Sequence, residues 1–191
     1  MSKTVVAFGV CGSFCTFEKT LVQMERLRAM GYEIIPIMSF NAAGLDTRFG
    51  KAEDWIRRLE ETAEHPVLRT LDQVEPLGPR KMADIMVVAP CTGTTLAKLD
   101  LGISDTPVTL GVKSMLRGGR PILLAPSTND GLGASARHLA ELLNRKHYFL
   151  VPLGQDAPYP KPNSLQSCFE MIPDGVEAAL RGNQLQPVLL T

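Results

Sequence analysis

The feature that most constrains the fold of this chain is a series of five short, continuous apolar runs of strand length. They occupy residues 4–10 (TVVAFGV), 33–38 (EIIPIM), 85–89 (IMVVA), 121–125 (PILLA) and 147–151 (HYFLV). Such runs are typical of strands in a parallel sheet that is covered on both faces. Helical patterns separate them, over residues 17–30, 52–63, 96–101, 106–116, 135–143 and 164–180. The alternation predicts an α/β fold, a single-domain doubly wound (Rossmann- or flavodoxin-like), mainly parallel sheet with helices on both faces.

The remaining segments are expected to be irregular. Residues 41–50 and 65–80 lack a clear period, and residues 154–162 form a proline-rich loop. Pro36 lies inside the second apolar run, which favours an edge position or a distorted strand end because proline cannot donate a ladder hydrogen bond. We expect one domain over residues 1–180, followed by a C-terminal arm over residues 181–191.

Composition excludes several classes of function. Twenty basic and twenty acidic side chains cancel, so no net field attracts nucleic acid or an anionic membrane. No apolar stretch approaches the roughly 20 residues that span a bilayer. The four cysteines suit neither a disulfide framework nor a zinc site, so reduced thiols and no metal are expected. We therefore expect a cytoplasmic protein that binds neither nucleic acid nor membranes.

Four polar loops fall at the carboxyl ends of the predicted strands, the edge at which parallel sheets bind ligands. We call this edge the rim. A plain strand-to-helix connection needs one capping residue, yet the loop after the third strand offers a thiol, a glycine and three threonines. The four loops are Gly12-Ser13, Met38-Ser39, Pro90 to Thr95, and Pro126 to Asp130. Their clustering predicts a binding site.

The loop residues favour a mononucleotide phosphate over a dinucleotide. The first turn has Gly9 and Gly12 but lacks the third glycine of the dinucleotide fingerprint, and no acidic residue ends the second strand. Helix N-termini and hydroxyl groups could satisfy phosphate oxygens. The candidate hydroxyls are those of Ser13, Ser39, Thr92 and Thr95. The alternative is that these side chains only cap helices.

The same loops resemble a known group of proteins. The motifs Gly9-x-x-Gly12-Ser13, Ser39 and Pro90-Cys91-Thr92-Gly93-Thr94-Thr95-Leu96-Ala97-Lys98 are similar to those of the homo-oligomeric flavin-containing cysteine decarboxylase superfamily. Longer blocks resemble one family within it, the B subunits of dipicolinate synthase. These blocks are DTRFG (46–50), APCTGTTLAKLDLGISDTPVTLGVKSMLR (89–117), STNDGLG (127–133), VPLGQDAPYPKPNSL (151–165) and QLQPVL (184–189). This second resemblance covers nearly the whole chain.

The resemblance implies a flavin site on the rim. It implies FMN as cofactor, bound by Gly12, Ser13, Ser39, Pro90, Cys91, Thr92, Thr94 and Thr95. The first three would lie at the phosphate end. The decarboxylases carry an asparagine where Thr94 stands, so the contacts at the isoalloxazine end stay open. Asn129 matches an asparagine that grips the substrate carboxylate in the decarboxylases, and the alternative is that it caps the next helix.

A second departure concerns the reaction. Pro76 stands where the decarboxylases place their catalytic histidine, and proline cannot transfer a proton. The family resemblance instead implies oxidation of a dihydrodipicolinate-level intermediate to dipicolinate during sporulation, in the mother cell. Asp130 and Asp105 are the candidate bases. The candidate ligands of the substrate carboxylates are Asn129, Arg48, Lys98 and Lys113.

The resemblance also implies partners. These are a small dicarboxylate substrate, the A subunit of dipicolinate synthase, which resembles a nicotinamide-binding dehydrogenase, and further copies of the chain in a trimer-based homo-oligomer. Two alternatives remain open. The chain is a stand-alone FMN-dependent decarboxylase or prenyltransferase-like enzyme, or it is a non-catalytic scaffold for the A subunit.

Overall fold

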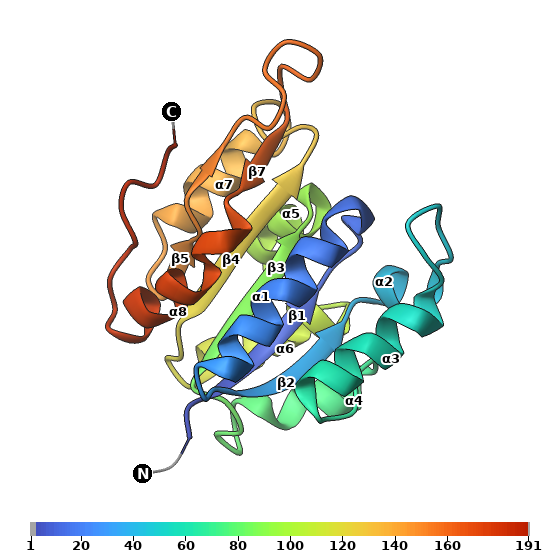
Figure 1. Ribbon diagram of the computed structural model, residues 1–191. Helices are drawn as coiled ribbons and strands as arrows, with labels where there is room; N and C mark the ends of the chain where they lie inside the picture. Colours follow the sequence, from blue (N-terminus) through green and yellow to red (C-terminus); the bar gives the residue numbers. More distant parts are fainter. Residues whose placement is uncertain (1–2, 191) are drawn as a thin grey trace.

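The computed structural model describes residues 3–190 and contains one seven-stranded sheet (Figure 1). Five strands run parallel, with β2 next to β1, then β3, β4 and β5. Their bounds are β1 Val5–Val10, β2 Glu33–Met38, β3 Ile85–Cys91, β4 Ile122–Thr128 and β5 Tyr148–Leu150. The predicted fold class is confirmed.

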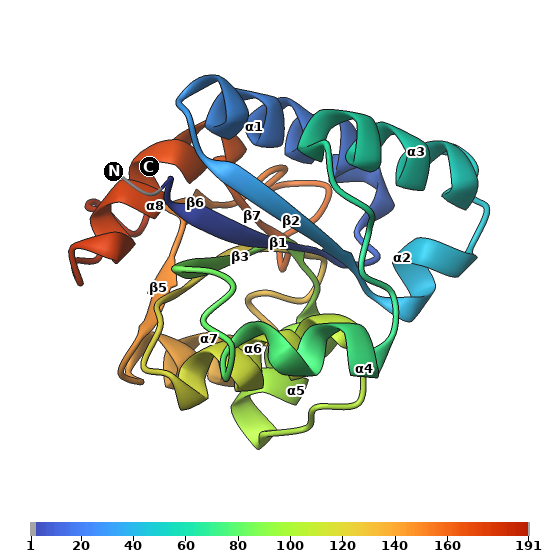
Figure 2. The same cartoon turned by 90° about the horizontal axis from the view of Figure 1, so that it is seen from below.

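Helices cover both faces of this sheet (Figure 2). One layer holds α1 Phe17–Ala29, α3 Ala52–Ala63 and α8 Ile172–Leu180. The opposite layer holds α4 Leu71–Val74, α5 Gly93–Leu101, α6 Pro107–Arg117 and α7 Ala136–Leu143. Short 3-10 turns precede or extend some of the helices. These turns are η1 Phe14–Thr16, η2 Glu75–Leu77 and η3 Phe169–Met171. No helix within residues 3–190 has the length and apolar character needed to cross a membrane.

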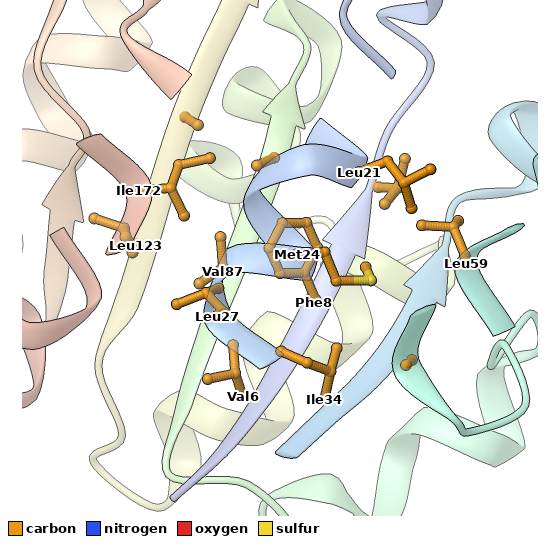
Figure 3. Close-up of a cluster of buried hydrophobic side chains, with 14 of the residues drawn as sticks. Val6, Phe8, Leu21, Met24, Leu27, Ile34, Leu59, Val87, Leu123 and Ile172 are labelled. Carbon is orange, nitrogen blue, oxygen red and sulfur yellow. The ribbon is translucent and has the colours of Figure 1, made fainter. Parts of the chain in front are cut away.

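The core lies in two layers of side chains because successive strand residues point to opposite faces. In β1, Val6 and Phe8 pack under α1, α3 and α8, whereas Ala7 packs toward α5, α6 and α7. Figure 3 shows the first of these clusters, which brings Met24 and Leu27 of α1 together with Val6 and Phe8 of β1. All five of these side chains are fully buried. This rigid centre fixes the positions of the loops at the rim.

The edge position predicted from Pro36 is confirmed. Among the strands, β2 pairs only with β1. On its outer side the Leu68 N–H donates to the Pro36 carbonyl at 2.9 Å, and the Met38 N–H donates to the Leu68 carbonyl at 3.0 Å. Leu68 therefore pairs with the outer edge of β2 on both sides of Ile37 and covers the edge at Pro36, which has no N–H group to donate.

Two short helices lie in segments that were predicted from the sequence to be irregular. Residues 40–44 form α2 (Phe40–Gly44), whose first turn is capped by Ser39. Residues 71–74 form α4, where Thr70 and Gln73 make a reciprocal capping box. Helices this short show too few turns to produce a recognisable period, so the capping residues were their only signal.

The helix predicted over residues 164–180 is wrong in its first part. Residues 165–167 form β7 (Leu165–Ser167), which runs antiparallel to the end of β4 and to β6 (Leu153–Gly154). Leu165, Phe169 and Ile172 have the spacing of a helical face, which produced the error. Pairing with β4 overrides that local pattern, and α8 begins only at Ile172.

Residues 181–190 contain no helix and return to their own protomer. The Val188 carbonyl accepts from the Leu153 N–H at 2.9 Å, and the Leu190 N–H donates to the Leu153 carbonyl at 2.9 Å. Earlier in the same segment, the Gln184 side chain accepts a hydrogen bond from the Leu150 N–H and donates one to the Leu150 carbonyl. Thr191, the end of the predicted arm, lies outside the described residues.

Candidate functional site

The structure brings the four polar loops together at the rim. The Cys11 N–H donates to the Pro90 carbonyl at 3.2 Å, and the Ser39 N–H donates to the Val10 carbonyl at 3.0 Å. These bonds join the ends of β1, β2 and β3. The loop after β4 joins them through Ser127, whose hydroxyl oxygen lies 3.0 Å from that of Ser13. The rim is thus one connected surface.

Two adjoining cavities open on this surface. The first, of about 360 Å³, is lined by Ser39, Thr95 and Lys98, and we call it the Ser39 cavity. The second, of about 630 Å³, is lined by Ser13, Arg48 and Asn129, and we call it the Asn129 cavity. They share the lining residues Gly12, Phe14, Thr92 and Thr94. Both volumes fall within the range of small-molecule sites.

Six of the eight residues predicted to bind the cofactor line these cavities. They are Gly12, Ser13, Ser39, Thr92, Thr94 and Thr95. Pro90 and Cys91 line neither, because both are buried in β3, where the Cys91 side chain packs into the core beneath α5 and α6. Pro90 acts through its carbonyl, which holds Cys11 in place.

The capping alternative holds for two of the four candidate hydroxyls. The Thr92 hydroxyl accepts from the Thr95 N–H at 3.2 Å and caps α5, and the Ser39 hydroxyl accepts from the Ala42 N–H at 3.3 Å and caps α2. Neither capping bond uses the donor capacity of the hydroxyl itself, but the Thr92 hydroxyl oxygen also lies 2.9 Å from that of Thr95, and either of these two can be the donor. At the start of α5, the N–H groups of Gly93 and Thr94 have no intrahelical acceptor. This positive helix end therefore faces the rim with donors available to an anion.

Gly93 allows the start of α5 to approach the loop after β4. A Cβ at this position would lie 2.5 Å from the Ser135 hydroxyl, 2.7 Å from the Thr128 hydroxyl and 2.8 Å from an Asp130 carboxylate oxygen. Those three polar groups bond one another, since Thr128 and Ser135 both donate to Asp130. Any larger residue would displace this cluster.

Both candidate bases are held in the charged form. The hydrogen bond from Thr128, assisted by that from Ser135, lowers the pKa of Asp130 from its usual value. The Lys98 ammonium lies 2.8 and 2.9 Å from the two Asp105 oxygens and lowers the pKa of that carboxyl. A carboxylate with a lowered pKa is a poor proton acceptor near neutral pH. Neither aspartate has the raised pKa that a base on this rim requires.

The four candidate substrate ligands do not all line the same cavity. Asn129 and Arg48 are exposed and line the Asn129 cavity. Asn129 does not cap the next helix, because Ser135 occupies the N-cap position of α7. Lys98 lines the Ser39 cavity, whereas Lys113 lines neither rim cavity and opens to a different one on the outer face of α6.

Arg48 is the least engaged cation at the rim. Three cations line the two cavities, and two have acidic partners: Lys98 with Asp105, and Lys161 with Asp156 at 3.3 Å. Within residues 3–190, Arg48 has no carboxylate within 4.0 Å, and its guanidinium lies 4.9 Å from the Phe49 ring centre. It is thus available to an anionic ligand.

Several lining residues were not predicted from the sequence. Cys11 lines the Ser39 cavity, and burial raises the pKa of its thiol to about 11, so it remains protonated. Phe14 lines both cavities. Lys161 and Gln166 reach the Asn129 cavity from the proline-rich loop and β7. The antiparallel pairing of β7 with β4 places Gln166, and no local sequence pattern signals this pairing.

Comparison with known proteins identifies the family of this chain. A family model described as Flavoprotein matches residues 1–168. The B subunit of dipicolinate synthase from Bacillus subtilis (strain 168) is 38% identical over 185 residues, which cover 97% of this chain and 92% of that protein.

Solved structures show the same relationship. The crystal structure of the B subunit of dipicolinate synthase from Bacillus halodurans is 40% identical, with a TM-score of 0.90 over 98% of this chain and 96% of that one. An FMN-dependent cysteine decarboxylase, SpaF, shares the fold at 23% identity, with a TM-score of 0.70 over 93% of this chain and 95% of that one. The chain therefore belongs to the flavoprotein family and, within it, to the B subunits of dipicolinate synthase.

Proposed function

We propose that this chain is the flavin-binding component of a dipicolinate synthase and holds FMN at the rim. The observation that carries the proposal is the pair of adjoining cavities that share Gly12, Phe14, Thr92 and Thr94. Together they offer a polar region and an adjacent larger space, the arrangement that a phosphate joined to a ring system requires.

The residues present fit a flavin mononucleotide. Hydroxyl groups and the free N–H groups of α5 are donors, which suit phosphate oxygens. Two of the three acids that line the cavities do not oppose an anion strongly, because Asp105 and Asp156 are paired with lysines. We assign the phosphate end to Gly12, Ser13 and Ser39, with Thr92, Thr94 and Thr95 beside them.

The second part of the proposal concerns the substrate, a dihydropyridine dicarboxylate. When bound, FMN supplies a two-electron acceptor for the oxidation. Asn129 and Arg48 line one cavity and each can donate hydrogen bonds to a carboxylate, Arg48 with a full charge. Their role is to orient the ring and to hold its carboxylates. Lys113 has no part in this step because it opens to another cavity.

The third part concerns dependence on the A subunit. Aromatisation requires removal of a proton, and the three carboxylates that line the rim cavities, Asp105, Asp130 and Asp156, all have lowered pKa values. We therefore assign the missing base to the A subunit. Three exposed apolar side chains beside the rim, Phe40, Leu45 and Phe49, form a surface suited to another chain. We assign this surface to a trimer-based homo-oligomer of the present chain.

A reconstitution experiment tests the proposal. The purified chain, loaded with FMN, is assayed for dipicolinate formation from freshly generated dihydrodipicolinate, by itself and with the A subunit. We expect turnover near the spontaneous rate for the chain by itself and a large increase when the A subunit is added. Robust turnover by the isolated chain would favour a stand-alone enzyme. Full activity of the complex without any flavin would favour a scaffold role.

A further inference from the structure

A third cavity opens on the outer face of the second helical layer, between α5, α6 and the segment that leads into β5. Figure 2 shows this layer, with α5, α6 and α7 together on one side of the sheet. The cavity has a volume of about 310 Å³, at the lower end of the range for small-molecule sites. We call it the Lys113 cavity.

All charged side chains that line the Lys113 cavity are positive. Four cations line it, Lys98, Lys113, Arg145 and Lys146, and no acidic residue does. Lys98 and Arg145 have carboxylate partners outside the lining. Lys113 and Lys146 have no carboxylate within 4.0 Å among residues 3–190, so their charge is not neutralised by the protein.

Two of the four cations, Arg145 and Lys98, are held by carboxylates that lie outside the cavity lining. The Asp100 carboxylate, whose side chain is only 11% exposed, bonds Arg145 Nη2 at 2.6 Å and His138 Nδ1 at 2.7 Å. Asp100 therefore ties the end of α5 to α7 and fixes the guanidinium of Arg145. The Asp105 carboxylate, whose side chain is 56% exposed, pairs with Lys98. An anion that entered the cavity would therefore meet two cations, Arg145 and Lys98, that are already positioned by carboxylates, which lowers the entropic cost of binding.

The floor of the cavity is apolar. Leu99, Val112 and Tyr148 line it, and all three are buried. Burial raises the pKa of Tyr148 to about 12, so its hydroxyl stays neutral and can donate a hydrogen bond. A basic entrance above an apolar floor suits a ligand with an anionic end and a compact apolar body.

We propose that the Lys113 cavity is a second anion-binding site, separate from the rim, that takes a small aromatic carboxylate. Its carboxylate lies between Lys113, Lys146 and Arg145, and its ring lies on Leu99, Val112 and Tyr148. Inorganic phosphate fits less well because it has no apolar part to cover that floor. The site does not depend on flavin binding. It shares one wall with the rim, since Lys98 also lines the Ser39 cavity.

Calorimetry on the full chain with benzoate as the probe tests this proposal. Removing two charge-assisted contacts in the double variant Lys113→Gln/Lys146→Gln should weaken benzoate binding by about tenfold or more. Arg117→Gln is the matched control, because Arg117 is an exposed cation on the same helix that does not line the cavity. Arg48→Gln reports any benzoate that binds at the rim instead, because Arg48 is a proposed carboxylate ligand there. Arg117→Gln should bind benzoate as the unaltered chain does, and all variants should unfold at the same temperature.

Three outcomes would overturn the proposal. One is the absence of benzoate binding to the unaltered chain. Another is binding that Arg48→Gln weakens and Lys113→Gln/Lys146→Gln does not, which would assign the ligand to the rim. The third is phosphate binding as tight as that of benzoate, which would remove the role of the apolar floor. If benzoate fails to bind and the double variant loses affinity for the A subunit, the face belongs to a protein partner instead.

Discussion

The hydroxyl oxygens of Ser13 and Ser127 lie 3.0 Å apart, although 114 residues separate them in sequence. The contact closes the rim between the loop after β1 and the loop after β4. It also places one serine from each loop beside the Asn129 cavity, where Ser13 is a proposed phosphate ligand.

The first prediction concerns this serine. Loss of one hydrogen bond to a charged group costs about 1.5–3 kcal/mol, so Ser13→Ala should weaken FMN binding by about tenfold or more. Calorimetry measures the affinity, and the unaltered chain should prefer FMN to FAD and NAD. Thr70→Ala is a suitable control, because Thr70 caps α4 away from the rim. It should lower stability by about 1 kcal/mol and leave FMN affinity unchanged. Equal losses in both variants would contradict the assignment.

Gly93→Ala should disturb the rim through packing. The added Cβ meets the hydroxyls of Thr128 and Ser135 and the Asp130 carboxylate at 2.5–2.8 Å. Overpacking of this kind costs about 1–3 kcal/mol, visible in urea unfolding, and should also weaken FMN binding. Gly44→Ala is the control, because a Cβ there meets nothing within 4 Å. Unchanged stability of Gly93→Ala would show that α5 can shift away from the loop.

Asp130 should make stability depend on pH. Its pKa is lowered in the folded protein, so the carboxylate stabilises the fold above its unfolded value of about 3.9. That contribution is lost as the pH falls through the lower, folded-state pKa. The difference in unfolding free energy between the unaltered chain and Asp130→Asn should therefore be largest near pH 7 and shrink below about pH 4. Asp72→Asn, at an exposed carboxylate in α4, is the control. A difference that stays constant down to pH 2 would exclude this linkage.

Asn129→Ala separates binding from capping. Because Ser135 is the N-cap of α7, removal of the Asn129 amide should leave the melting temperature unchanged. In the reconstituted enzyme it should raise KM for the dicarboxylate by about tenfold, as expected for loss of a hydrogen bond to a charged group. A capping role would instead lower stability by about 1 kcal/mol and leave KM unaltered.

The sequence predicts the central sheet well because that part of the fold depends on local composition. The apolar runs correspond to β1 to β5, and Pro36 correctly indicates the edge strand. Four of the strand ends carry the polar loops, so the rim follows from the strand order. Ser13 and Ser39 could be chosen because hydroxyl side chains suit both helix caps and anions, whereas Gly12 was implied by the family resemblance.

The rest depends on contacts between distant residues. Leu165 has a helical spacing with Phe169, yet its segment pairs with β4 and carries Gln166 to the Asn129 cavity. Lys113 was grouped with Arg48 and Lys98 as a cation that could reach the substrate carboxylates, but it lines the Lys113 cavity and neither of the rim cavities. Charge and residue type do not report the face of a helix on which a side chain lies when the packing of that helix is unknown.

The pairing of Leu153 with residues 188–190 affects how this chain can associate with others. It covers the outer edge of β6, and Leu68 covers the outer edge of β2. The third edge strand, β5, has the backbone of Leu150 bonded by the Gln184 side chain. A second polypeptide could pair with β2 or β6 as an extra strand only after one of these segments is displaced. The proposed homo-oligomer therefore has to form through the surfaces of helices and loops.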